Sequence, residues 1–224
     1  MDSPTPKRSR DYSGIGILLS NAFAIVLALV QDWDLRPMLV IYWSQSVIIG
    51  VFNFWRIMKL RQFSTKGFTS NGKRVLENET GKRSTAWFFA MHYGMFHVGY
   101  LVFVLTMVFG AGEEGDFASR WRPSSLEIFW VISAIIAFLF GHAFSFVRNV
   151  ASDLERRPNL GTMMFLPYAR IIPMHLVAIF GAGAGSNRVA VFVFSLLKTG
   201  ADYLMHIVEH RVLQKAPKKE AAAE

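Results

Sequence analysis

The chain has 224 residues, which is within the range of one domain. Hydrophobic residues make up 52% of it, aromatic residues 14%, and phenylalanine alone occurs 20 times. The formal net charge is +8, but the basic residues stand between apolar segments, where such residues set membrane orientation, so we exclude a nucleic-acid-binding protein. Cysteine is absent, which excludes structural disulfides and thiolate metal sites.

Six apolar segments are long enough to cross a bilayer, whose hydrocarbon core of about 30 Å needs roughly 20 helical residues. A helix is expected in lipid because every backbone polar group must be satisfied within the segment. We therefore predict an all-α polytopic membrane protein, a single six-transmembrane-helix bundle over residues 1–212, followed by a disordered cytoplasmic tail at 213–224. The predicted spans are 13–30, 37–60, 87–110, 126–147, 163–184 and 189–212.

Local signals add detail to these spans. Pro123 and Ser124 precede the fourth span and indicate a helix start there. Pro173 lies inside the fifth span and predicts a kink. Glycines inside spans predict close helix contacts, and they are Gly94 and Gly99 in the third span and Gly181, Gly183 and Gly185 in the fifth.

The distribution of positive charge predicts the orientation. Lys and Arg number 18 in the two tails and the loops at 56–83 and 148–157, against four in the opposite loops. The positive-inside rule therefore places both termini in the cytoplasm of a protein of the inner (plasma) membrane. The longest loop, 62–85, is polar and basic, and we expect an exposed, partly mobile connection there. Its charges predict attraction to anionic lipid of about 1 kcal/mol each.

Ionisable residues inside the spans are the main indication of function. Such a group costs at least about 2.5 kcal/mol at mid-bilayer, so it usually faces the bundle and has a partner. In the last span Lys198, Asp202, His206 and His210 are spaced by four and share one helix face. We expect Lys198 and Asp202 to pair within the helix or with Arg170. Two histidines four residues apart can bind one metal, and His206 to His210 with Glu209 also matches the inverzincin pattern, in which the carboxylate is the general base.

Depth gives a second, independent regularity. At 1.5 Å per residue, His92, His142, Arg170 and His206 all lie roughly 7–12 Å below the cytoplasmic surface. Asn53 reaches the same level, and Gln45 lies deeper on the same face. On the third helix His97 points about 140° away from His92, so we assign it to interhelical hydrogen bonding. We predict one polar cavity in the cytoplasmic half, lined by His92, His142, Arg170, His175, Lys198, Asp202 and His206, with Gln45 and Asn53 beside it.

Four segments resemble a bacterial six-helix integral-membrane family that is classed as a domain of unknown function. They are YWSQSVIIGVFN at 42–53, FFAMHYGMF at 88–96, RIIPMH at 170–175 and LKTGAD at 197–202 with His206. The resemblance covers the chain from the second span to the last. It brings no established activity, but it implies that His92, Arg170, His175, Lys198, Asp202 and His206 belong together.

A more distant likeness is to intramembrane zinc hydrolases of the alkaline ceramidase and adiponectin receptor type. Those proteins place an Asp, a Ser and three His inside a seven-helix bundle. The resemblance implies comparable roles here for His92, Asp202 and the His206–His210 pair, although this chain has six predicted spans.

Several functions stay open at this point. The cluster could bind an ion or a proton and serve transport or relay. It could instead form an intramembrane hydrolase with zinc or another divalent metal on His92, His206 and either His210 or His142. Asp202 or Glu209 would then be the general base, and Arg170 would stabilise the oxyanion. The protein could also be a structural scaffold whose buried charges fix helix register, and a haem protein is the weakest alternative because no span holds the paired histidines of a haem-binding bundle.

Overall fold

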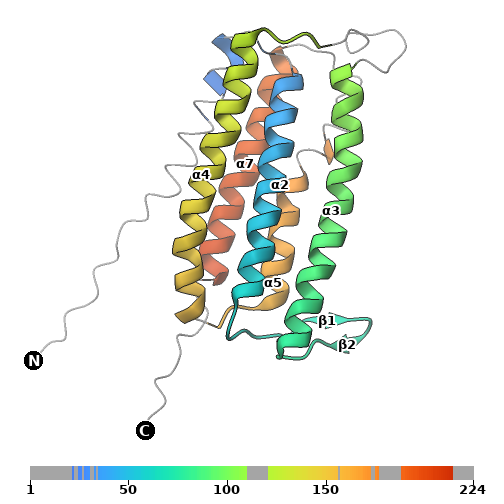
Figure 1. Cartoon of the computed structure of the whole chain (residues 1–224), viewed down its shortest axis with the longest axis vertical. Helices are drawn as coiled ribbons and strands as arrows, with labels where there is room; N and C mark the ends of the chain where they lie inside the picture. The colour runs from blue at the N-terminus through green and yellow to red at the C-terminus, as the bar shows by residue number, and fades with distance from the viewer. Residues whose placement is uncertain are drawn as a thin grey trace, which may run out of the picture.

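The computed structural model describes residues 33, 35–109, 121–155, 157–172, 175, 176 and 188–213, together with residues 22, 25, 26 and 28–30 of the first predicted span (Figure 1). The described residues of that first span are helical. The remaining elements are α2 (Leu35–Lys59), β1 (Thr69–Ser70), β2 (Lys73–Arg74), α3 (Glu79–Phe109), α4 (Ser125–Glu155), α5 (Leu160–Phe165), the 3-10 helix η1 (Leu166–Ile171) and α7 (Arg188–Leu213).

Within the described residues, three helices are long and apolar enough to cross a membrane: α2, α3 and residues Ser125–Val147 of α4. The prediction of a mostly helical chain with membrane-spanning segments is confirmed to this extent. The α4 helix leaves nearly all of its apolar residues uncovered by protein, among them Phe129, Phe140 and Phe144. A surface of that kind suits a lipid environment. The other three predicted spans stay a prediction.

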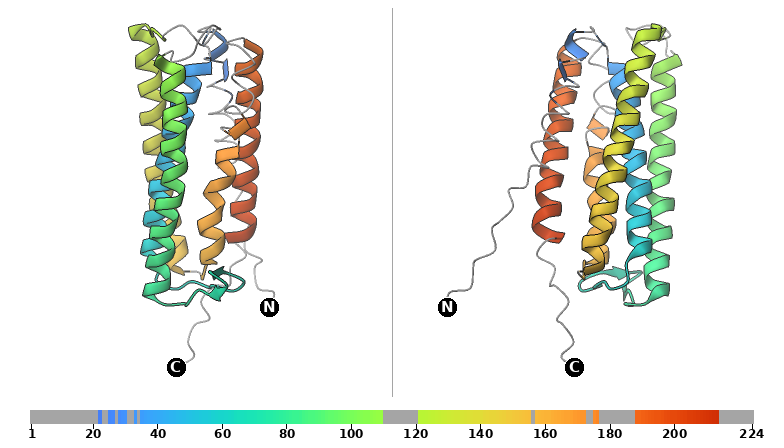
Figure 2. Two further views of the ribbon diagram at one scale, coloured as in Figure 1. Left: turned by 90° about the vertical axis from the view of Figure 1, so that its right-hand side faces the viewer. Right: turned by 60° about the vertical axis from the view of Figure 1, so that its left-hand side comes forward.

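Helix α2 is the centre of the bundle. It contacts α3, α4, α5, η1 and α7, and Figure 2 shows α2, α3 and α4 together on one side with α5 and α7 on the other. The approach of α2 to α3 is close at Gly50, where an added Cβ would lie 2.5 Å from a ring carbon of Tyr93. An added Cβ at Gly94 or Gly99 would meet no atom of the described chain within 4 Å. The predicted close contacts at these two glycines are therefore wrong for the described residues, and Gly181, Gly183 and Gly185 lie outside them.

Capping residues explain where two helices begin. The Ser124 hydroxyl accepts from the Glu127 backbone N–H at 3.2 Å, and the Glu127 carboxylate accepts from the Ser124 N–H at 3.3 Å. This capping box confirms the predicted start of α4. The α3 helix begins at Glu79 rather than at Trp87, because Asn78 accepts from the Gly81 N–H at 2.9 Å and so caps a polar first turn. Hydropathy alone does not detect such a polar turn.

The fifth predicted span changes its helical form at a proline. Helix α5 ends at Phe165, and the chain continues as η1 with Pro167 in its first turn. Pro167 has no N–H to donate to the carbonyl of Met163, four residues earlier. The side-chain amide of Asn53 on α2 donates to that carbonyl instead, at 3.1 Å. The kink predicted at Pro173 lies outside the described residues.

The long basic loop is folded. Its strands β1 and β2 pair antiparallel across a turn in which Asn71 and Gly72 have positive φ angles. Ser64 pairs in parallel with Asn159, through hydrogen bonds of 2.9 Å to the Pro158 carbonyl and 2.8 Å from the Leu160 N–H. The hairpin is exposed, as expected, but Phe63 and Thr65 are buried. Main-chain hydrogen bonds thus attach the segment at Ser64 to the α4–α5 connection, and the expected mobility of the loop stays a prediction.

Candidate functional site

Helix α7 carries a buried ion pair. The Lys198 ammonium lies 3.0 Å from a carboxylate oxygen of Asp202, and each residue is only 7% exposed. The pair joins positions four apart on one helix, as their spacing predicts. Both residues belong to the buried face of α7, which also contains Val191, Phe194 and Ser195.

Among the described residues, α2 and α7 itself contribute aromatic rings beside this pair. The Lys198 ammonium lies 5.3 Å from the centre of the Tyr42 ring of α2, a cation–π distance. Phe194 packs edge-on against the same ring at 5.6 Å. One turn from Lys198, the Ser195 hydroxyl is 1% exposed and has no hydrogen-bond partner among the described residues. A buried hydroxyl without a partner is costly, and Ser195 shares this state with the indole N–H groups of Trp33 and Trp130.

A second polar group joins α2 to α3 through a buried serine. The Ser46 hydroxyl lies 2.9 Å from His97 Nε2 and 2.9 Å from the Tyr93 hydroxyl, which also donates to the Ser46 carbonyl at 3.0 Å. His97 Nδ1 lies 2.9 Å from the Tyr93 carbonyl, which can only accept, so Nδ1 carries a hydrogen. In the neutral ring Nε2 then accepts from Ser46. The assignment of His97 to interhelical hydrogen bonding agrees with this geometry.

These two groups share α2. Tyr42 faces Lys198 and Ser46 faces His97, and the two residues are one turn apart near the middle of α2. We use the name polar layer for the set that crosses the bundle in this way: Tyr42, Ser46, Tyr93, His97, Ser195, Lys198 and Asp202.

His92 of α3 and His175, which follows η1 in the chain, lie beside the polar layer. His92 Nδ1 is 2.9 Å from the Tyr168 hydroxyl of η1, and its ring stacks on Phe88 at 5.3 Å. His175 Nε2 is 3.5 Å from the Tyr100 hydroxyl. His92 and His175 therefore each pair with a tyrosine, and α3 faces the Tyr168–His175 segment through a row of aromatic rings.

Other residues of the predicted cavity lie elsewhere. His142 stacks on Phe138 at 4.6 Å and lies near Phe52, at the contact between α4 and α2. Asn53 bonds to α5, and Gln45 is half-buried on α2. The described side chains thus occupy separate helix contacts: His92 lies between α3 and η1, His142 between α2 and α4, and the Lys198–Asp202 pair between α2 and α7. The side chains of Arg170, His206, Glu209 and His210 lie outside the described residues.

The predicted metal site includes histidines whose side chains lie outside the described residues. Among the described residues, no group of three or more His, Asp or Glu side chains is placed to bind a metal ion. The ligand set proposed from the sequence relies on His206 and His210, so zinc binding stays a prediction that metal analysis of the purified protein tests. The described part of the site offers proton-exchanging and hydrogen-bonding groups.

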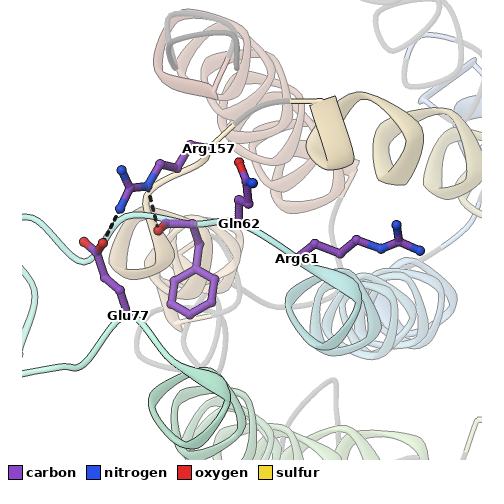
Figure 3. Close-up of a pocket in the computed structure, with 5 residues that line it drawn as sticks. Arg61, Gln62, Glu77 and Arg157 are labelled. Atoms are coloured by element: carbon purple, nitrogen blue, oxygen red, sulfur yellow. Dashed lines mark hydrogen bonds and ion pairs between the residues drawn. The ribbon is translucent and has the colours of Figure 1, made fainter. Parts of the chain in front are cut away.

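A pocket of about 350 Å³ lies between the folded loop after α2 and the α4–α5 connection. It is lined by Arg61, Gln62, Phe63, Glu77 and Arg157. Figure 3 shows Arg157 between the Glu77 carboxylate and the Phe63 carbonyl, while Arg61 points away from this ion pair. The Thr65 N–H donates to Glu77 at 2.9 Å. This hydrogen bond, with Arg157 beside it, holds the pKa of the Glu77 carboxyl below its ordinary value. The pocket is therefore built around a carboxylate that is already paired.

A model of a protein family matches residues 3–219, which is nearly the whole chain. Its description is a family of unknown function, DUF6498. The chain belongs to this family. Neither a curated protein nor a solved structure matches it. The predicted membership of a family of unknown function is therefore confirmed, and the match covers nearly the whole chain.

Sequence reasoning missed several members of the site. Ser46, Tyr42 and Tyr168 are ordinary residues for an apolar helix, and their roles depend on which helix faces them. The sequence does contain a signal for Tyr93. It stands four residues before His97 on the same helix, so the two side chains share a face. No comparable signal marks Ser195, whose importance follows only from its burial.

Proposed function

We propose that this chain is a six-span protein of the inner membrane, with both termini in the cytoplasm, that binds and exchanges protons at the polar layer. The observation that carries the proposal is the Lys198–Asp202 pair, 3.0 Å apart and buried in the middle of α7. Ionisable groups inside a membrane are expensive and are typically retained for function.

The chemistry available at this site fits proton exchange. Proton binding to Asp202 would neutralise its carboxylate and free the Lys198 ammonium from the ion pair. The Tyr42 ring, 5.3 Å away, and the Ser195 hydroxyl, one turn along α7, lie where they can stabilise that cation. His97, hydrogen-bonded to Ser46 one turn along α2 from Tyr42, supplies a further ionisable side chain in the polar layer.

The alternative of a purely structural scaffold makes a different prediction about Ser195. If the buried charges only fixed helix register, each buried polar group would be expected to have its partner within the fold. The Ser195 hydroxyl, which is buried and has no hydrogen-bond partner among the described residues, supports a site that accepts a water molecule or a proton carrier. We therefore place binding ahead of the scaffold.

Proton flux into liposomes tests the proposal. The purified protein is reconstituted with a pH-sensitive dye inside the vesicles, and a potassium diffusion potential drives proton entry. We expect faster internal acidification with the wild type than with empty vesicles, and a loss of this difference in Asp202→Asn. The matched control is Thr199→Val, since the Thr199 hydroxyl donates to the carbonyl of Ser195 in its own helix and lies outside the ion pair.

Ser195→Ala separates function from folding. This variant removes a hydroxyl that has no described partner, so its melting temperature in detergent should not fall. We expect its proton flux to decrease. Equal flux in wild type, Ser195→Ala and empty vesicles would contradict the proposal and support the scaffold.

Cysteine accessibility tests the proposed orientation. Ser70 lies at the exposed tip of the hairpin in the basic loop. A cysteine placed there is the only one in the chain. It should react with a membrane-impermeant thiol reagent only after intact cells are permeabilised. Rapid labelling in intact cells would reverse the orientation.

A further inference from the structure

Two exposed tryptophans mark one level on adjacent helices. Trp55 of α2 is 51% exposed and Trp87 of α3 is 55% exposed. The ring of Phe54 lies edge-on to both, at 5.4 Å from Trp55 and 5.2 Å from Trp87. Because one ring contacts both, the two indoles lie near each other and at a similar height on adjacent helices. Exposed tryptophans gather at membrane–water interfaces, so this height is the natural position of the boundary.

A cation follows each tryptophan by one helical turn, in the direction of the basic loop. Lys59 stands four residues after Trp55 on α2, and Arg83 stands four residues before Trp87 on the antiparallel α3. All four side chains are exposed. Four residues correspond to about 6 Å along the helix axis, which is comparable to the thickness of one headgroup layer of a bilayer, about 5–8 Å.

Nearby acidic residues do not neutralise these two cations. The segment from Arg56 to Arg83 contains only two acidic residues, Glu77 and Glu79. Glu77 pairs with Arg157 and Arg74, and Glu79 pairs with the buried Lys82 at 2.6 Å. Lys82 in turn donates to the Leu60 carbonyl at 2.8 Å, which holds the end of α2 against the start of α3. Within the described part of the chain, Lys59 and Arg83 have no ion-pair partner.

We propose that Lys59 and Arg83 form a binding site for the phosphate of an anionic lipid headgroup, with Trp55 and Trp87 beneath it at the interface. The site rests on the membrane orientation proposed above and is separate from the polar layer. Its cations are held by two helix ends that Lys82 connects, so it differs from a diffuse attraction of flexible basic residues to a charged surface.

Lipid titration followed by native mass spectrometry tests this site on the full-length protein in detergent. Phosphatidylglycerol is compared with phosphatidylcholine, for wild type and for the double variant Lys59→Gln/Arg83→Gln. The matched control is Lys66→Gln/Lys73→Gln, which removes the same charge from exposed positions in the loop, away from the tryptophans. An arm with inorganic phosphate in place of lipid separates a lipid site from a site for the free anion.

We expect the wild type to prefer phosphatidylglycerol, and the Lys59/Arg83 variant to lose about fivefold in affinity for each charge removed. The control variant should retain most of the preference. An equal loss in both variants, or binding of inorganic phosphate that displaces the lipid, would overturn the proposal. If the preference is absent while the cysteine at position 70 is still protected in intact cells, the orientation stands and only the lipid site fails.

Discussion

The side-chain amide of Asn53 donates a hydrogen bond to the backbone carbonyl of Met163 at 3.1 Å. The carbonyl belongs to a residue that is almost completely buried, and the residue four positions later is Pro167. Asn53 thus replaces the backbone donor that proline lacks and attaches the start of the fifth predicted span to the central helix.

Asn53→Leu should lower the free energy of unfolding by about 1–3 kcal/mol, because the buried carbonyl of Met163 loses its hydrogen-bond donor. Thermal melting in detergent measures the change. Gln45→Leu is the control, since Gln45 is half-buried on the same helix and makes no hydrogen bond with the described residues. In a Pro167→Ala background the loss should shrink, because the new N–H can donate to Met163. An undiminished loss there would contradict this account.

Ser46→Ala should destabilise the contact between α2 and α3. The substitution removes the shared partner of His97 Nε2 and the Tyr93 hydroxyl, and we expect a cost of about 1–3 kcal/mol. Ser44→Ala on the same helix is the control, because the Ser44 hydroxyl donates only to the Val40 carbonyl of its own helix. Similar melting temperatures for the two variants would show that the Ser46 network does not stabilise the bundle.

The attachment of the basic loop should weaken at acidic pH. The Thr65 N–H and Arg157 lower the pKa of Glu77 below its ordinary value of 4.5. A carboxyl whose pKa is lowered in the folded state contributes stability above its unfolded pKa, and this contribution is lost as the pH falls through the lower, folded value. Melting of wild type and Glu77→Gln should therefore differ at pH 7 and converge as the pH falls below about 4.5. A difference in melting temperature that does not change with pH would contradict a stabilising role of the ionised Glu77 carboxylate.

The ion pair on α7 should respond differently to single and double substitution. Lys198→Met or Asp202→Leu alone removes one partner of a buried ion pair, at a cost of about 3–5 kcal/mol. The double variant Lys198→Met/Asp202→Leu should be closer to wild type in melting temperature, because apolar residues of similar volume often replace a buried pair without loss. If the double variant is the least stable of the three, the pair stabilises the fold in its own right.

Length, hydropathy and spacing predicted those features of the fold that depend on a single segment of the chain. The bounds of α2 and α7, the start of α4 at Ser125 and the pairing of Lys198 with Asp202 all follow from neighbours along the chain. The early start of α3 was missed because its first turn is polar and depends on the Asn78 cap.

What sequence reasoning could not supply is the pairing of distant segments. Tyr168 bonds to His92 across 76 positions, and its direction depends on the 3-10 geometry of η1. The attachment of Ser64 to the α4–α5 connection depends likewise on a main-chain register that no side-chain pattern encodes. The predicted common depth of the histidines fixes only their height along the helices. To form one site, their side chains must also point toward the same place in the bundle.

The central position of α2 has a consequence for biogenesis. Ser46 lies 47 positions before its partner Tyr93, so the next helix of the chain supplies that partner. Asn53 lies 110 positions before Met163. At roughly 5–20 residues per second, its amide spends on the order of 5–20 s without its native acceptor during synthesis. The α2–α3 contact at Ser46 can therefore form before the fifth predicted span has been synthesised, whereas the contact of Asn53 with Met163 can form only after it.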